Sequence, residues 1–187
     1  MPAHEKNVEM LVKLAKEKGV KSAKLISTKD IVVGNYVAQK CKFGCPYFAK
    51  RFTCPPYSPT PSETREVLKS YNHALLFEFI RLVSDKKRPK IHEVMFELER
   101  NAFLNGFHMA FAYAAGPCRI CPRCPAEEVK DRNEFSKKEC INPLMARPSM
   151  EASSIDVYKT ARKAGFEINP VKERGQDYKS FGLLLLE

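Results

Sequence analysis

The chain has 187 residues and a formal net charge of +10 at pH 7, with 44% hydrophobic and 29% charged residues. This length and composition suit one sizeable core, and we expect residues 1–187 to form a single domain. The apolar run at residues 182–186 is too short to span a bilayer, and the N-terminus lacks the apolar core of a signal peptide. We therefore expect a cytoplasmic protein with no membrane contact, whose charge attracts anionic small molecules or acidic proteins.

The N-terminal part predicts a helix followed by extended chain. Residues 5–18 place apolar side chains at helical spacing, with lysines on the other face and Gly19 as the stop. Residues 23–27 and 31–38 contain β-branched and other apolar residues on either side of a short polar turn. This pattern predicts two strands.

A first cysteine-rich stretch, residues 41–61, follows these elements. Its thiols are Cys41, Cys45 and Cys54, and both Cys45 and Cys54 precede proline. Proline fixes its own φ and lacks a backbone N–H, so the five prolines of this stretch predict a rigid loop.

A helix and a buried strand are predicted next. Thr60 and Glu63 stand at the positions of a capping box, with a proline at the first helical position. Residues 74–83 are apolar on both faces, as in a strand covered on both sides. Glu78 interrupts that strand and needs a partner or a route to water.

A helix over residues 91–105 and a strand over residues 108–115 complete the central part. The order of elements from residue 31 to 115 predicts an α/β fold with a mixed, largely parallel sheet flanked by helices. Loops at the carboxyl ends of parallel strands share one edge of a sheet. Both cysteine-rich stretches are therefore expected at one edge.

A second cysteine-rich stretch, residues 116–151, holds Cys118, Cys121, Cys124 and Cys140. A C-x2-C-x2-C run with a distant fourth cysteine is typical of iron–sulfur proteins. Zinc sites more often use two separated C-x2-C pairs, or cysteine with histidine, and the chain has no histidine after residue 108. The spacing favours a [4Fe–4S] cluster and keeps zinc as the alternative.

After this stretch, Ser153 or Ser154 is predicted to cap a helix that continues through residue 164. Residues 166–169 and 181–186 are predicted to be the last strands.

The seven thiols are an odd number in an expected cytosolic protein, which argues against disulfides. Their division into four and three predicts two clusters, although one centre built from both stretches stays open. Four cysteines close a cubane of four irons, whereas Cys41, Cys45 and Cys54 leave one iron open to substrate for Lewis-acid or sulfur chemistry.

Polar residues near Cys41, Cys45 and Cys54 bear on whether this group leaves an iron open to substrate. Lys50 and Arg51 would favour an anionic or sulfur-bearing ligand there. Tyr47 and Tyr57 could donate hydrogen bonds, although packing is the simpler interpretation of both. Tyr47 or Glu151 could instead fill the fourth position and make the centre a closed electron carrier.

Three residues after the second group are candidates for catalysis. Arg147 offers an anion clamp, Ser149 a hydroxyl and Glu151 a proton carrier. The simpler alternative for Arg147 and Glu151 is a structural ion pair that braces the loop after Cys140.

The two cysteine stretches, Cys-Pro-Pro at 54–56, Gly-Pro-Cys at 116–118 and the run from Ala146 to Ala152 resemble an uncharacterised prokaryotic family of predicted metal-binding proteins. The resemblance runs from about Cys41 to Thr160. It implies metal binding at the cysteines and supplies no reaction. It also implies a glycine where this chain has Ser153-Ser154, so the start of the following helix is expected to differ.

Three functions fit these patterns. The first is an enzyme with an open iron site, and the second is an electron-transfer module for an acidic partner such as a flavodoxin or ferredoxin. The third is a zinc-binding module that contacts nucleic acid. We rank it last because no aromatic–basic recognition motif accompanies the charge.

Overall fold

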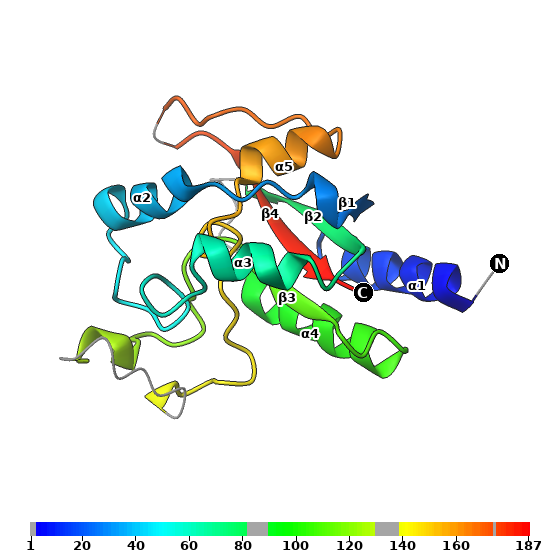
Figure 1. The fold of residues 1–187 in the computed structure, drawn as a ribbon, viewed down its shortest axis with the longest axis horizontal. Coiled ribbons are helices and arrows are strands. Elements are labelled where there is room, and N and C mark those ends of the chain that lie inside the picture. Colours follow the sequence, from blue (N-terminus) through cyan, green and yellow to red (C-terminus); the bar gives the residue numbers. More distant parts are fainter. Residues whose placement is uncertain (1–2, 82–89, 130–138, 174) are drawn as a thin grey trace.

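A computed structural model describes residues 3–81, 90–129, 139–173 and 175–187 (Figure 1). The described helices and strands follow the chain in this order: α1 Ala3–Glu17, β1 Ser22–Ser27, η1 Thr28–Asp30, α2 Asn35–Gly44, α3 Pro61–Leu68, β2 His73–Arg81, α4 Ile91–Leu104, β3 Phe111–Tyr113, η2 Pro125–Glu127, α5 Val157–Lys163 and β4 Tyr178–Leu185.

The four strands form one sheet in the order β1-β2-β4-β3, and every neighbouring pair is antiparallel. The prediction of a largely parallel sheet is therefore wrong. The C-terminal strand β4 inserts between β2 and β3, so these two strands run in the same direction without pairing. Nothing in the order of elements along the chain revealed this insertion.

Both faces of the sheet are covered, as expected for strand β2. Leu75, Phe77 and Phe79 pack into one core cluster with residues of α1 and α4. Ala74 and Leu76 face the opposite way, into a second cluster with residues of α5. The alternation follows from the two-residue period of a strand. Residues 82 and 83, the predicted end of this strand, lie outside the described residues.

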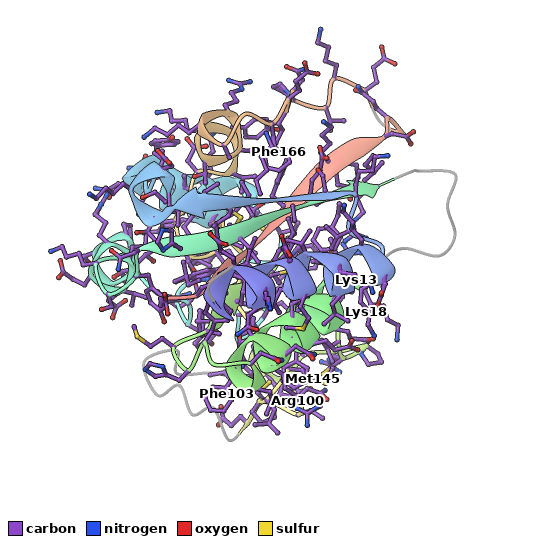
Figure 2. All side chains as sticks on the ribbon, turned by 90° about the vertical axis from the view of Figure 1, so that its right-hand side faces the viewer. Lys13, Lys18, Arg100, Phe103, Met145 and Phe166 are labelled. Atoms are coloured by element: carbon purple, nitrogen blue, oxygen red, sulfur yellow. The ribbon has the colours of Figure 1, made fainter. Side chains whose placement is uncertain are left out.

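Figure 2 shows α1 and α4 side by side on one face of the sheet, with α5 on the other. The ammonium of Lys18, at the end of α1, lies 2.5 Å from a carboxylate oxygen of Glu97 on α4. On the α5 side, the rings of Phe166 and Phe181 meet edge to face with centroids 5.2 Å apart. The sheet is therefore the middle layer of three.

Two local predictions are confirmed by hydrogen bonds. The Thr60 hydroxyl accepts from the Glu63 N–H at 3.3 Å, and a Glu63 carboxylate oxygen accepts from the Thr60 N–H at 2.7 Å, which completes the capping box of α3. Glu78 has two partners, the Ser22 hydroxyl at 2.7 Å and the Lys179 ammonium at 2.8 Å. These contacts explain how β2 tolerates a carboxylate.

Three other local predictions are wrong. The predicted strand at 31–38 is a short extended segment, with a single bridge from Val33 to Ile155, that passes into α2. Residues 166–169 form no strand, and Asp156 rather than Ser153 or Ser154 caps α5. Apolar β-branched residues alone predicted the strand at 31–38, whereas the chain turns into helix from Asn35 onward.

No helix among the described residues combines the length and apolar character that a membrane crossing requires.

Candidate metal centres

The second cysteine-rich stretch follows β3, which points toward the same end of the sheet as β2. β1 runs antiparallel to β2, so its own carboxyl end lies at the opposite end of the sheet. The chain returns along residues 31–34 and enters α2, which carries the first cysteines. Both stretches consequently lie at one side of the molecule (Figure 1).

The segment Ser149–Asp156 joins these two parts of the chain. At one end, Met150 donates its backbone N–H to the Ala114 carbonyl at 3.1 Å, beside the start of the second stretch. At the other end, Asp156 donates to the Val32 carbonyl at 2.7 Å. The segment therefore lies alongside both chains that lead into the cysteines.

Two buried hydroxyls hold the middle of this segment. Ser58 donates to the Ala152 carbonyl at 2.7 Å, and Thr64 of α3 donates to the Ser153 carbonyl at 2.8 Å. Ser154 has a φ of +64°, a conformation that L residues rarely adopt and glycine adopts freely. This backbone conformation accounts for the glycine implied here by the family resemblance.

The three thiols of the first stretch line one cavity of about 880 Å³. The prediction of a loop is wrong for Cys41, which lies in helix α2. Cys45 ends that helix, and Cys54 is buried in the turns that follow. Burial, together with the charges of Cys45 and Cys41, raises the pKa of Cys54 to about 12. Burial, Cys45 and Glu151 raise the pKa of Cys41 to about 11. These mutual effects indicate that the three sulfurs are neighbours.

The four thiols of the second stretch line a different and much smaller cavity, of about 20 Å³. Burial raises the pKa of Cys118, the Ile120 backbone N–H opposes that shift, and Cys121, Cys124 and Cys140 raise it further. The Asn142 amide also donates to the Cys121 sulfur at 3.0 Å. Residues 130–138, the middle of the predicted loop, lie outside the described residues.

All seven cysteines lie in the described part of the chain, where each is a free thiol. In the ranges that the structure describes, no three cysteine, histidine or acidic side chains already have the arrangement that holds one metal ion. The donor set nevertheless fits a thiolate-bound metal or cluster, because each stretch directs all its sulfurs to one cavity. Protonated thiols must lose their protons when they bind metal.

The structure separates the three candidate catalytic residues. Ser149 and Glu151 line the larger cavity with Cys41. Burial raises the pKa of the Glu151 carboxyl, while hydrogen bonds from its own N–H, the Ser149 hydroxyl and the Gly116 N–H act in the opposite direction. The Glu151 backbone carbonyl also lies 3.8 Å from the Cys41 sulfur. Glu151 thus contacts both Gly116, at the start of the second stretch, and Cys41 of the first.

Arg147 points elsewhere and pairs with Glu99 of α4. The predicted structural ion pair therefore exists with Glu99 as the partner, and not Glu151. Ser149 accepts the Ala152 N–H at 3.1 Å, so its oxygen helps to turn the segment Ser149–Asp156.

Other residues of the first stretch also divide between the two cavities. Arg51 pairs with Glu127 and lines the smaller cavity, next to the second group of thiols. Tyr47 lies beneath the guanidinium groups of Arg51 and Arg119, and Tyr57 packs edge to face on Phe52 at 5.3 Å. Arg51 and Lys50 do not line the larger cavity, although the charge of Arg51 opposes the rise in the pKa of Cys54. Their role beside Cys41, Cys45 and Cys54 stays a prediction.

Sequence patterns missed several residues of the larger cavity. His92 is only 7% exposed and lines this cavity with Arg119 and Lys40. Its position in the first turn of α4 gave a signal, because apolar residues flank it at helical spacing. Arg119 gave none, since a basic residue between two cysteines has many possible partners.

The fold and the thiol geometry define an α/β protein with two thiol-lined cavities at one end of its sheet. Comparison with protein families identifies the particular group: the chain belongs to the family described as Predicted metal-binding protein (DUF2284), whose model matches residues 24–186. No curated protein and no solved structure matches the chain significantly. The resemblance seen in the sequence is confirmed, and metal binding is the property that the family description supports.

Proposed function

We propose that this protein is an iron–sulfur protein with two separate thiol sites. Cys118, Cys121, Cys124 and Cys140 form one site, and Cys41, Cys45 and Cys54 form the other. One observation carries the proposal: the sulfurs of each stretch line a cavity of their own. The C-x2-C-x2-C spacing of Cys118, Cys121 and Cys124 supports a [4Fe–4S] cluster over zinc at the four-thiol site.

Side chains around the four-thiol site support a closed, structural or electron-carrying role. Its cavity is small, and the Asn142 amide donates a hydrogen bond to the Cys121 sulfur. Hydrogen bonds to ligand sulfurs raise the reduction potential of such centres. The ion pair between Arg51 and Glu127 covers the same region and ties the two cysteine-rich stretches together.

Surroundings of the three-thiol site support a different role. Three cysteines leave room for a small molecule as a further ligand, and the cavity beside them is large enough to admit one. An iron–sulfur cluster supplies electron transfer or, where one iron lacks a protein ligand, Lewis-acid chemistry. Ser149 and Glu151 would hydrogen-bond a ligand or hold a proton there, and Arg147 would not take part because Glu99 occupies it.

The test is metal and sulfide analysis of protein purified without oxygen. The proposal predicts brown protein that contains iron and acid-labile sulfide in similar amounts. Colourless protein with stoichiometric zinc and no sulfide would favour the zinc alternative and refute the iron–sulfur assignment. An open iron predicts that small anions or thiols perturb the spectrum, whereas an unresponsive spectrum would favour an electron-transfer module with an acidic partner protein.

A further inference from the structure

The larger cavity extends well beyond the three thiols. Its volume of about 880 Å³ lies within the range of about 300–1,000 Å³ typical of small-molecule sites. It reaches from α2 and the Cys45–Pro55 region, past Gly116, to the first turn of α4 and the start of β4. Much of this space is remote from any cluster that three cysteines could hold.

The end of the cavity near α4 contains a buried polar side chain whose hydrogen-bonding capacity is not satisfied. His92 is 7% exposed, and its Nε2 atom has no hydrogen-bond partner in the part of the chain that the structure describes. A buried nitrogen without a partner costs free energy, which a bound ligand would recover. Burial lowers the pKa of His92 to about 4, and the charges of Arg81 and Arg119 contribute to that shift. These two cations are therefore close to the imidazole.

Among the charged groups that line the cavity, the acidic ones are bound by neighbouring residues, while some of the basic ones can contact a ligand. Asp156 binds the Tyr36 hydroxyl and the Lys159 N–H, and Glu93 pairs with Lys90 at 3.0 Å. Arg119, by contrast, has a long hydrogen bond of 3.4 Å to the Tyr47 hydroxyl and a ring contact with the same residue. Lys40 of α2 lies 6.0 Å from the centroid of the Tyr36 ring. Glu151, the third acidic residue of the lining, accepts hydrogen bonds from the Ser149 hydroxyl and the Gly116 N–H. The acidic groups are thus engaged within the protein, and the balance favours an anion.

Other walls of the cavity are apolar. Ile155, Val157 and Phe181 come from the core cluster on the α5 face of the sheet, and Ile120 comes from the second cysteine-rich stretch. A fully polar anion would leave these walls without contacts. A ligand that combines an anionic group with an apolar body would satisfy both the cations and the walls.

We propose that this cavity binds a small organic anion, a carboxylate or phosphate with an apolar body. His92 and Arg119 bind the anionic group, and the body lies along the apolar walls toward Cys41, Cys45 and Cys54. The proposal deepens the proposed function, because it names the class of molecule held beside the three-thiol site. Binding is measured separately from metal content, so the two proposals fail independently.

The experiment is calorimetric titration of the full-length protein, purified without oxygen, with four matched probes. Octanoate carries both features, octylammonium reverses the charge, octanol removes it and acetate removes the apolar body. Octanoate is expected to bind at least about tenfold more tightly than octanol and octylammonium, which lose a charge-assisted hydrogen bond, and than acetate, which loses the buried apolar chain. Equal binding of octanoate and octylammonium, or no binding of octanoate, would overturn the proposal.

Two pairs of variants place the site in this cavity. Arg119→Gln is expected to weaken octanoate binding about tenfold, whereas Arg123→Gln, on the same stretch but outside the cavity, leaves it unchanged. Lys40→Gln is expected to weaken it about threefold, and Lys42→Gln on the same helix serves as its control. Iron content and circular dichroism are recorded for every variant. Unchanged binding in both Arg119→Gln and Lys40→Gln would contradict the proposed site.

Discussion

Arg147 and Glu99 form a two-pronged ion pair between the segment after Cys140 and helix α4. The Arg147 Nε lies 2.8 Å from one Glu99 oxygen and the Nη2 lies 2.5 Å from the other. Glu99 also accepts the Ala112 N–H of β3 at 2.8 Å. The two side chains are only 14% and 13% exposed. This pair joins the middle of β3 to the approach to the segment Ser149–Asp156.

Replacing Arg147 should therefore affect stability and not chemistry. Arg147→Ala leaves the Glu99 carboxylate partly buried with only one partner, which costs about 3 kcal/mol of the free energy of unfolding. Urea unfolding measures this loss. Arg100→Ala, an exposed neighbour of Glu99, is the control and should change the free energy by less than about 0.5 kcal/mol. A stable Arg147→Ala protein that no longer binds small anions would restore the anion-clamp role.

The hydroxyl of Thr64 provides a second test of the packing around the cysteines. Thr64→Val keeps the shape of the side chain but leaves the Ser153 carbonyl without its 2.8 Å hydrogen bond. A buried carbonyl that loses its partner costs about 1–3 kcal/mol. Thr64→Ser keeps the hydroxyl and should recover much of this loss in the same unfolding experiment. Equal stability of Thr64→Val and the unaltered protein would mean that this bond does not hold the segment.

His92 predicts a specific dependence of stability on pH. Burial lowers its pKa to about 4 in the folded protein, below the value of about 6.5 in an unfolded chain. The neutral imidazole therefore contributes stability that is fully present above pH 6.5 and is lost as the pH falls toward 4. Between pH 7 and pH 5, the free energy of unfolding should fall about 2 kcal/mol more in the unaltered protein than in His92→Gln.

If His92→Gln also follows the unaltered protein between pH 7 and pH 5, His92 does not titrate as its burial requires.

Local signals in the sequence predicted much of the secondary structure. The capping box at Thr60 is visible because both partners are three residues apart, and the apolar run of β2 is visible because both of its faces are buried. Topology was predicted wrongly because the position of β4 between β2 and β3 depends on contacts distant in sequence. The expectation that both cysteine groups lie at one side rested on a parallel sheet, whereas the observed sheet is antiparallel.

The candidate site was predicted in part. Cysteine spacing separates the two thiol groups without any structure, because ligands of one centre are often close in sequence. The partner of Arg147 was not predictable, since Glu99 lies 48 residues away. His92 and Arg119 meet only when α4 and the second cysteine-rich stretch pack together, so no local pattern marks their shared cavity.

The most direct test of the central claim compares iron and acid-labile sulfide in the unaltered protein, Cys45→Ala and Cys118→Ala, all purified without oxygen. Two separate [4Fe–4S] sites predict about eight irons per chain in the unaltered protein and about four in each variant. Each variant should also retain the spectrum of the site that it leaves intact. Complete loss of iron from both variants, with folding unchanged, would contradict two sites and indicate one centre built from both cysteine-rich stretches.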